Sequence, residues 1–142
     1  MLRTEETPTY IAYTDSGYHI CRDGGAYAYI LLKDGEIIRK EAFLFRHESN
    51  NRGELHAIIA AIENLPYGAD VEIRTDSQYA VNTLTGEWLQ RRNTDLFARW
   101  HEIVRGKKLK VKVGWIRAHS GDVYNQMCDD LCCETADVFM RE

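Results

Sequence analysis

The first third of the chain has the residue pattern of β-strands. Residues 9–14 form a short apolar and aromatic run that ends at Asp15, which predicts a buried strand. Residues 26–45 are rich in strand-forming residues on both sides of Asp34-Gly35, and an Asp-Gly pair between two such runs is a strong hairpin signal. Asp23-Gly24-Gly25 marks a turn before this hairpin. We therefore expect three antiparallel strands at the start of the domain.

Helices and strands alternate in the rest of the chain. Apolar residues at helical spacing predict a helix that Asn50 or Asn51 caps, with Pro66 and Gly68 ending it. Alternating apolar and polar residues predict a strand that runs from residue 69 into Asp76, and another over residues 109–115. Further helices are expected over residues 77–84, 96–104 and 125–137.

This order predicts an α/β fold with one mixed five-stranded sheet, in which three strands are antiparallel and two are parallel, flanked by helices. Ligands of such sheets bind outside the carboxyl ends of the parallel strands. The pattern places Asp15 and Asp76 at two of these ends. Because 142 residues, 44% of them hydrophobic, suit one core of ordinary size, we expect a single domain over residues 1–142.

Charge and composition narrow the function. A net charge of -4 argues against a protein that coats nucleic acid by bulk electrostatics, so any such contact must be local or assisted by metal. The chain has no apolar run that could span a bilayer, and its start lacks the profile of a signal peptide, so we expect a soluble, cytoplasmic protein. Reduced thiols are predicted for four cysteines that lack the spacing of a zinc site: Cys21, Cys128, Cys132 and Cys133.

Four acidic residues have apolar neighbours. Asp15 and Asp76 follow apolar strands, Glu54 precedes the apolar stripe of a helix, and Asp129 lies on the last predicted helix. Each alone fits an ordinary role as a cap, a turn former or a complement to a helix dipole. Together they would repel one another unless a cation compensates, and hard divalent ions prefer oxygen ligands. The set therefore predicts a divalent-metal site, and paired metal ions are one way to support phosphodiester hydrolysis.

Four sequence blocks carry a family resemblance: Tyr13-Thr14-Asp15-Ser16-Gly17, Asn50-Asn51-Arg52-Gly53-Glu54-Leu55, Thr75-Asp76-Ser77-Gln78-Tyr79, and Ala118-His119-Ser120-Gly121 followed by Asn125 and Cys128-Asp129-Asp130-Leu131. In order and spacing they resemble the signature of type 1 ribonuclease H over almost the whole chain. The resemblance implies the ribonuclease H-like fold and an endonuclease that hydrolyses the RNA strand of RNA–DNA hybrids, leaving 5′-phosphate and 3′-hydroxyl ends.

The resemblance also implies roles for individual residues. Two Mg²⁺ ions, which Mn²⁺ could replace, would be coordinated by Asp15, Glu54, Asp76 and Asp129. His119 would assist proton transfer or product departure, a task that suits a group titrating near neutrality. The same four acids would be catalytic residues together with His119.

Substrate contacts form a second group of candidates. The resemblance implies that Asn50 and Gln78 face the RNA strand and Asn51 the DNA backbone, and an amide, like the 2′-hydroxyl, can both donate and accept hydrogen bonds. Arg52 could bind a phosphate or form a surface ion pair, and Trp88 could stack on the substrate or pack in the core. Ser16, next to Asp15, completes the candidate set.

The chain departs from the family pattern in several places. Ser16-Gly17 replaces the usual Gly-Ser, residues 18–21 replace a glycine- and proline-rich stretch, Gln126 stands where an acid is common, and Cys132-Cys133 stand where small residues are usual. The altered loop after Asp15 bears on rate and 2′-hydroxyl discrimination more than on activity. The short link from Trp88 to Asn93 leaves no room for the basic protrusion of many members, and no amino-terminal hybrid-binding domain is expected. We therefore expect weak binding that depends steeply on metal.

Two alternatives compete with this interpretation. One is a catalytically weak domain of the same fold that only holds hybrids or a protein partner, against which the intact acids and His119 argue. The other is a nuclease of the wider fold that acts on DNA, against which the paired amides argue. The expected partner is an RNA–DNA hybrid, with a monomeric protein and no obligate protein partner.

Overall fold

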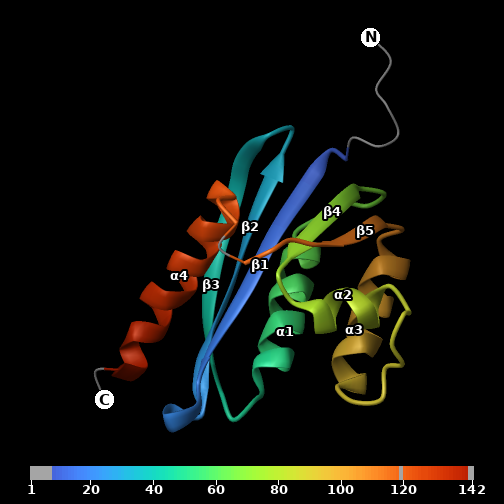
Figure 1. The fold of residues 1–142 in the computed structure, drawn as a ribbon. Helices are drawn as coiled ribbons and strands as arrows, with labels where there is room; N and C mark the ends of the chain where they lie inside the picture. The colour runs from blue at the N-terminus through green and yellow to red at the C-terminus, as the bar shows by residue number, and fades with distance from the viewer. Residues whose placement is uncertain (1–7, 119, 141–142) are drawn as a thin grey trace.

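The computed structural model describes residues 8–118 and 120–140, which form a five-stranded sheet with helices on both faces (Figure 1). The order across the sheet is β3-β2-β1-β4-β5. β1, β2 and β3 pair antiparallel, whereas β1 with β4 and β4 with β5 pair parallel, which confirms the predicted fold class. The elements are, in chain order, β1 (Tyr10–His19), the 3₁₀ helix η1 (Ile20–Arg22), β2 (Gly24–Lys33), β3 (Glu36–Arg46), α1 (Asn50–Glu63), β4 (Asp70–Thr75), α2 (Gln78–Leu84), α3 (Thr94–Gly106), β5 (Lys110–Trp115) and α4 (Val123–Met140).

The two faces of the sheet bury separate apolar cores. On one face α1 packs against β1 and β2, and α3 packs against α1, with Ile58, Ile73 and Trp100 in the larger core. On the other face α4 lies across β1 and β2 (Figure 1), where Ile30 and Cys128 belong to a smaller core. The central strands are thus held from both sides, which fixes the strand ends that carry the candidate acids.

The predicted hairpin between β2 and β3 is confirmed. Asp34 and Gly35 both have positive φ, 49° and 86°, which a two-residue turn joining twisted antiparallel strands requires. Lys33 and Glu36 pair directly across this turn. The Asp-Gly pair therefore sets the register of the hairpin, because glycine and aspartate tolerate this backbone better than most residues.

β1 is longer than predicted, and Asp15 does not end it. The parallel ladder between β1 and β4 ends at the pair Thr14 and Thr75, but β1 stays paired with β2 as far as His19 and Gly24. The prediction of a strand ending at residue 14 was wrong because it used apolar character alone, whereas β2 continues to offer hydrogen-bond partners to the polar residues. Asp15 therefore lies at the end of the parallel ladder and inside the antiparallel one.

Two helix starts also differ from the prediction. The N-cap of α1 is Ser49, whose hydroxyl accepts a hydrogen bond from Arg52 N at 3.2 Å, so neither Asn50 nor Asn51 is the cap. α4 begins at Val123, two residues earlier than predicted. There Asp122 Oδ1 accepts hydrogen bonds from the backbone amides of Tyr124 and Asn125 in the first turn. The Ser49 cap leaves both asparagine side chains available to the site described below.

All four cysteines carry free thiols, as predicted. Cys128 and Cys132, on α4, are buried in the smaller core, and Cys21 and Cys133 are exposed. Among residues 8–118 and 120–140, no helix has both the length and the apolar character needed to cross a membrane.

Replacing Ser49 tests how far the first turn of α1 depends on its cap. Ser49→Ala removes the side-chain acceptor for Arg52 N and should lower the free energy of unfolding by about 1 kcal/mol. Ser49→Asp keeps an acceptor and serves as the matched control. Urea denaturation monitored by far-UV circular dichroism measures both, and equal loss in the two variants would contradict the role of the cap.

Candidate metal centre and substrate pocket

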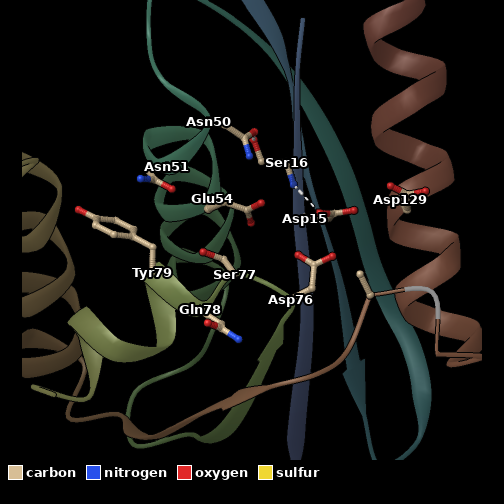
Figure 2. A pocket seen from close by; sticks show the side chains of 11 residues that line it. Asp15, Ser16, Asn50, Asn51, Glu54, Asp76, Ser77, Gln78, Tyr79 and Asp129 are labelled. Carbon is tan, nitrogen blue, oxygen red and sulfur yellow. Dashed lines mark hydrogen bonds between the residues drawn. The ribbon is translucent and has the colours of Figure 1, made fainter. Parts of the chain in front are cut away.

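Three carboxylates from three elements meet at the end of the parallel ladder. Asp15 comes from β1, Glu54 from α1, and Asp76 from the residue after β4, and one oxygen of each lies within 4.8 Å of the others. Figure 2 shows Asp129 of α4 facing the same space from the other side. The structure therefore brings together all four acids predicted from the sequence, three in a tight cluster and the fourth across from it.

Burial and mutual repulsion make the charged form of these acids unfavourable. Asp15 is 5% exposed and Glu54 4%. Burial, followed by the charge of Asp76, raises the pKa of Asp15 to about 8, although the Ser16 amide, which donates a hydrogen bond of 2.9 Å, acts in the opposite direction. Burial and the charges of Asp15 and Asp76 also hold the pKa of Glu54 well above its usual range.

The cluster fits a hard divalent cation. Glu54 Oε2 is buried and has no hydrogen-bond partner among the described residues, although a buried carboxylate oxygen normally has one. Oxygen ligands from several carboxylates are what Mg²⁺, Mn²⁺ and Ca²⁺ prefer, and a cation would remove the repulsion and satisfy the open oxygen together. Asp15, Glu54 and Asp76 would hold it, with Asp129 close by.

The acids lie in a pocket of about 480 Å³ that also contains most of the candidate substrate contacts. Ser16, Asn50, Asn51 and Gln78 line it, as the sequence blocks predicted. Ser77, Tyr79 and Ala118 complete the lining. His119 directly follows Ala118 but lies outside the described residues, so its role stays a prediction.

Two candidate contacts do not line this pocket. The guanidinium of Arg52 donates to Glu48 at 2.8 Å and forms paired hydrogen bonds of 2.9 and 2.7 Å with Asp95, which ties α1 to the first turn of α3. Trp88 is half exposed in the segment between α2 and α3. The structure thus shows the ion pair that was one of two options for Arg52, and phosphate or stacking contacts by either residue remain predictions.

Trp115 supports the site in a way that sequence reasoning missed. Its indole N–H donates to the backbone oxygen of Asp76 at 3.2 Å, and it pairs with Thr75 across the β4–β5 ladder. Strand alternation predicted an apolar face that includes Trp115, yet this side chain is 47% exposed. One signal in the sequence could have indicated this contact. Trp115 is the last residue of its predicted strand, and Asp76 follows the end of the other predicted parallel strand.

The sheet and the acid cluster together define an α/β protein with an acidic cluster, suited to a divalent cation, at the carboxyl ends of two parallel strands. A family model described as RNase H matches residues 7–137, nearly the whole chain. The chain therefore belongs to the ribonuclease H family.

Individual relatives agree with this assignment. The chain is 33% identical over 141 residues to a protein named ribonuclease H from Campylobacter jejuni subsp. jejuni serotype O:23/36 (strain 81-176), covering 92% of each sequence. It is 29% identical over 148 residues to the ribonuclease H of Trichodesmium erythraeum (strain IMS101), covering 94% of this chain and 92% of the relative. Among solved structures, the crystal structure of LC11-RNase H1 in complex with an RNA/DNA hybrid superposes with a TM-score of 0.79 at 21% identity, covering 92% of this chain and 99% of the other.

The raised pKa of Asp15 predicts how stability depends on pH without divalent cations. A carboxyl whose pKa is about 8 in the folded protein and near 3.8 in the unfolded chain keeps its proton to a higher pH in the folded protein. The free energy of unfolding should therefore fall as the pH rises between these values, by at most about 1.4 kcal/mol per pH unit for one group. Urea unfolding in EDTA at several pH values measures the slope.

Two comparisons test the source of this slope. Asp15→Asn should make the slope shallower, with the buried Glu54 contributing the remainder, whereas Asp137→Asn, which changes an exposed acid on α4, should leave it unchanged. Added Mg²⁺ should stabilise the protein most at high pH, where the acids are deprotonated and can act as ligands. A stability that rises with pH over this range in EDTA would contradict the assigned direction.

Proposed function

We propose that this protein is an endoribonuclease that hydrolyses the RNA strand of RNA–DNA hybrids with the help of divalent cations, Mg²⁺ first among them. The observation that carries the proposal is the buried cluster of Asp15, Glu54 and Asp76 opening into a pocket lined by amide side chains. Membership of the ribonuclease H family supports it, and so does the RNA/DNA hybrid with which the superposed LC11-RNase H1 was crystallised.

The residues of the pocket divide the work of the reaction. Asp15, Glu54, Asp76 and Asp129 would hold two cations, which when bound supply an activated water and stabilise charge on the departing 3′ oxygen. Asn50, Asn51 and Gln78 would position the two strands, and His119 would assist proton transfer or product departure. The reaction would leave 5′-phosphate and 3′-hydroxyl ends. A monomeric, cytoplasmic enzyme is part of the same proposal.

Cleavage assays on matched substrates test the proposal. With Mg²⁺ the protein should cut the RNA strand of a labelled hybrid and leave double-stranded DNA and double-stranded RNA of the same sequence intact. Comparable cleavage of DNA would instead identify a DNA-acting nuclease. Binding of the hybrid without cleavage under any divalent cation would identify a silent hybrid-binding domain.

Replacing Asp76 tests the metal assignment. Asp76→Asn removes one carboxylate of the cluster and should lower turnover by more than about 100-fold, because loss of a residue that merely supports a metal ligand already costs about 10- to 100-fold. Glu102→Gln makes the same acid-to-amide change on the exposed face of α3 and should leave turnover unchanged. Unchanged turnover in Asp76→Asn would show that the cluster does not bind the catalytic metals.

The segment between α2 and α3 predicts weak binding in the absence of metal. Residues 85–93, all of which are described, contain no helix and expose Trp88, Arg91 and Arg92. With few cations to contact phosphates, the Kd for a hybrid in EDTA should lie at about 1–100 µM at physiological salt, the range of non-specific binding. Fluorescence anisotropy with and without divalent cations measures this, and nanomolar affinity in EDTA would contradict it.

A further inference from the structure

Ser16 and the first turn of α1 make a close contact at the rim of the pocket. The Ser16 hydroxyl donates a hydrogen bond to Asn50 Oδ1 at 3.0 Å, and only 9% of Ser16 is exposed. Figure 2 shows the two side chains next to each other, on the same side of the pocket as Glu54. The contact thus joins the residue that follows Asp15 to the helix that carries Glu54.

Gly53 provides the space in which the Ser16 hydroxyl lies. A Cβ atom at residue 53 would come within 2.1 Å of Ser16 Oγ and within 3.0 Å of two ring carbons of Phe45. Glycine is among the least favourable residues inside a helix, and here its backbone has no positive φ that would explain it. Because Gly53 has no side chain, β1 can approach α1 closely at Ser16.

In the structure the Ser16 hydroxyl engages the oxygen end of the Asn50 amide. An asparagine amide has an oxygen that accepts and an NH2 group that donates two hydrogen bonds, and rotation by half a turn exchanges them. Ser16 engages the oxygen, and Asn50 itself lines the pocket. The NH2 group is then the end that a molecule in the pocket meets, so Asn50 selects acceptor atoms.

We propose that Ser16 is a positioning residue that, seated against Gly53, fixes the Asn50 amide so that its NH2 group donates to acceptor atoms in the minor groove of the hybrid. This inference rests on the proposed function. Every base pair presents acceptors in the minor groove, and the 2′-oxygens of the RNA strand are acceptors too. A fixed donor can therefore meet an acceptor at any base pair, whatever the sequence. Ser16 acts through Asn50 and is not a separate substrate contact.

A kinetic double-mutant cycle tests this dependence. Ser16→Ala should raise the KM for a hybrid by about fivefold, the effect of losing one hydrogen bond, with little change in kcat. Asn50→Ala should raise KM at least as much, and the double variant should be no worse than Asn50→Ala alone. Additive losses would show that Ser16 contacts the hybrid by itself and would overturn the proposal, as would an unchanged KM in Ser16→Ala.

A second cycle tests the seat at Gly53 with stability as its readout. Gly53→Ala should destabilise the protein markedly, and the same change in a Ser16→Gly background should destabilise it less, because the contact at 2.1 Å is gone while the Phe45 contact is the same in both. Thermal unfolding measures this cycle. Equal destabilisation in the two backgrounds would show that Ser16 does not occupy the space at Gly53.

Modified hybrids distinguish the acceptors and separate this inference from the proposed function. One hybrid carries a single 2′-deoxynucleotide in its RNA strand, and another carries a 3-deazapurine, which lacks a minor-groove base acceptor. One of these modifications should slow cleavage by the wild type at a defined position and slow cleavage by Ser16→Ala less. Equal effects on the wild type and on Ser16→Ala would overturn the inference. A wild type that cleaves no hybrid would refute the proposed function, whereas additive losses in an active wild type refute only the role of Ser16.

Discussion

The repulsion among buried carboxylates is the constraint on which the rest of this structure depends. Asp15, Glu54 and Asp76 bring oxygens within 4.8 Å of one another, and Asp15 and Glu54 are almost fully removed from water. Such charges are unfavourable without a compensating partner. Burial and the charge of Asp76 raise the pKa of Asp15 to about 8, so without a cation this carboxyl keeps its proton to a higher pH than usual. A divalent cation bound to the cluster would compensate the same repulsion with the acids deprotonated.

The sheet resists this repulsion by fixing the acids in register. Thr14 and Thr75 pair at the last step of the parallel ladder, so the residues that follow them, Asp15 and Asp76, emerge side by side. A shift of one residue would turn these side chains to the opposite face of the sheet. Glu54 is held against the same edge because the next residue, Leu55, is buried in the larger core with the rest of the apolar face of α1.

Local sequence patterns predicted the features that depend on residues within a single helix, strand or turn. The Asp34-Gly35 turn, the helices and the positions of the acids after apolar runs all follow from short-range spacing. The length of β1 could not be predicted, because its polar second half is held by pairing with β2. Ser49, Asn50 and Asn51 are all good caps by residue type, and only the packed geometry selects Ser49. The fit of Ser16 against Gly53 joins two elements far apart in the sequence, and no local pattern reports it.

The position of Asp129 depends on contacts between distant elements, which the sequence pattern also does not predict. Tyr13, two residues before Asp15 and so on the same face of β1, donates its hydroxyl to Asp122 at 3.1 Å and accepts from Arg74 of β4 at 2.7 Å. Asp122 in turn caps the start of α4. The two strands that lead into Asp15 and Asp76 therefore also hold the helix that carries Asp129. The fourth acid reaches the pocket because the strand alternation that orients Asp15 also places an anchor for α4 beside it.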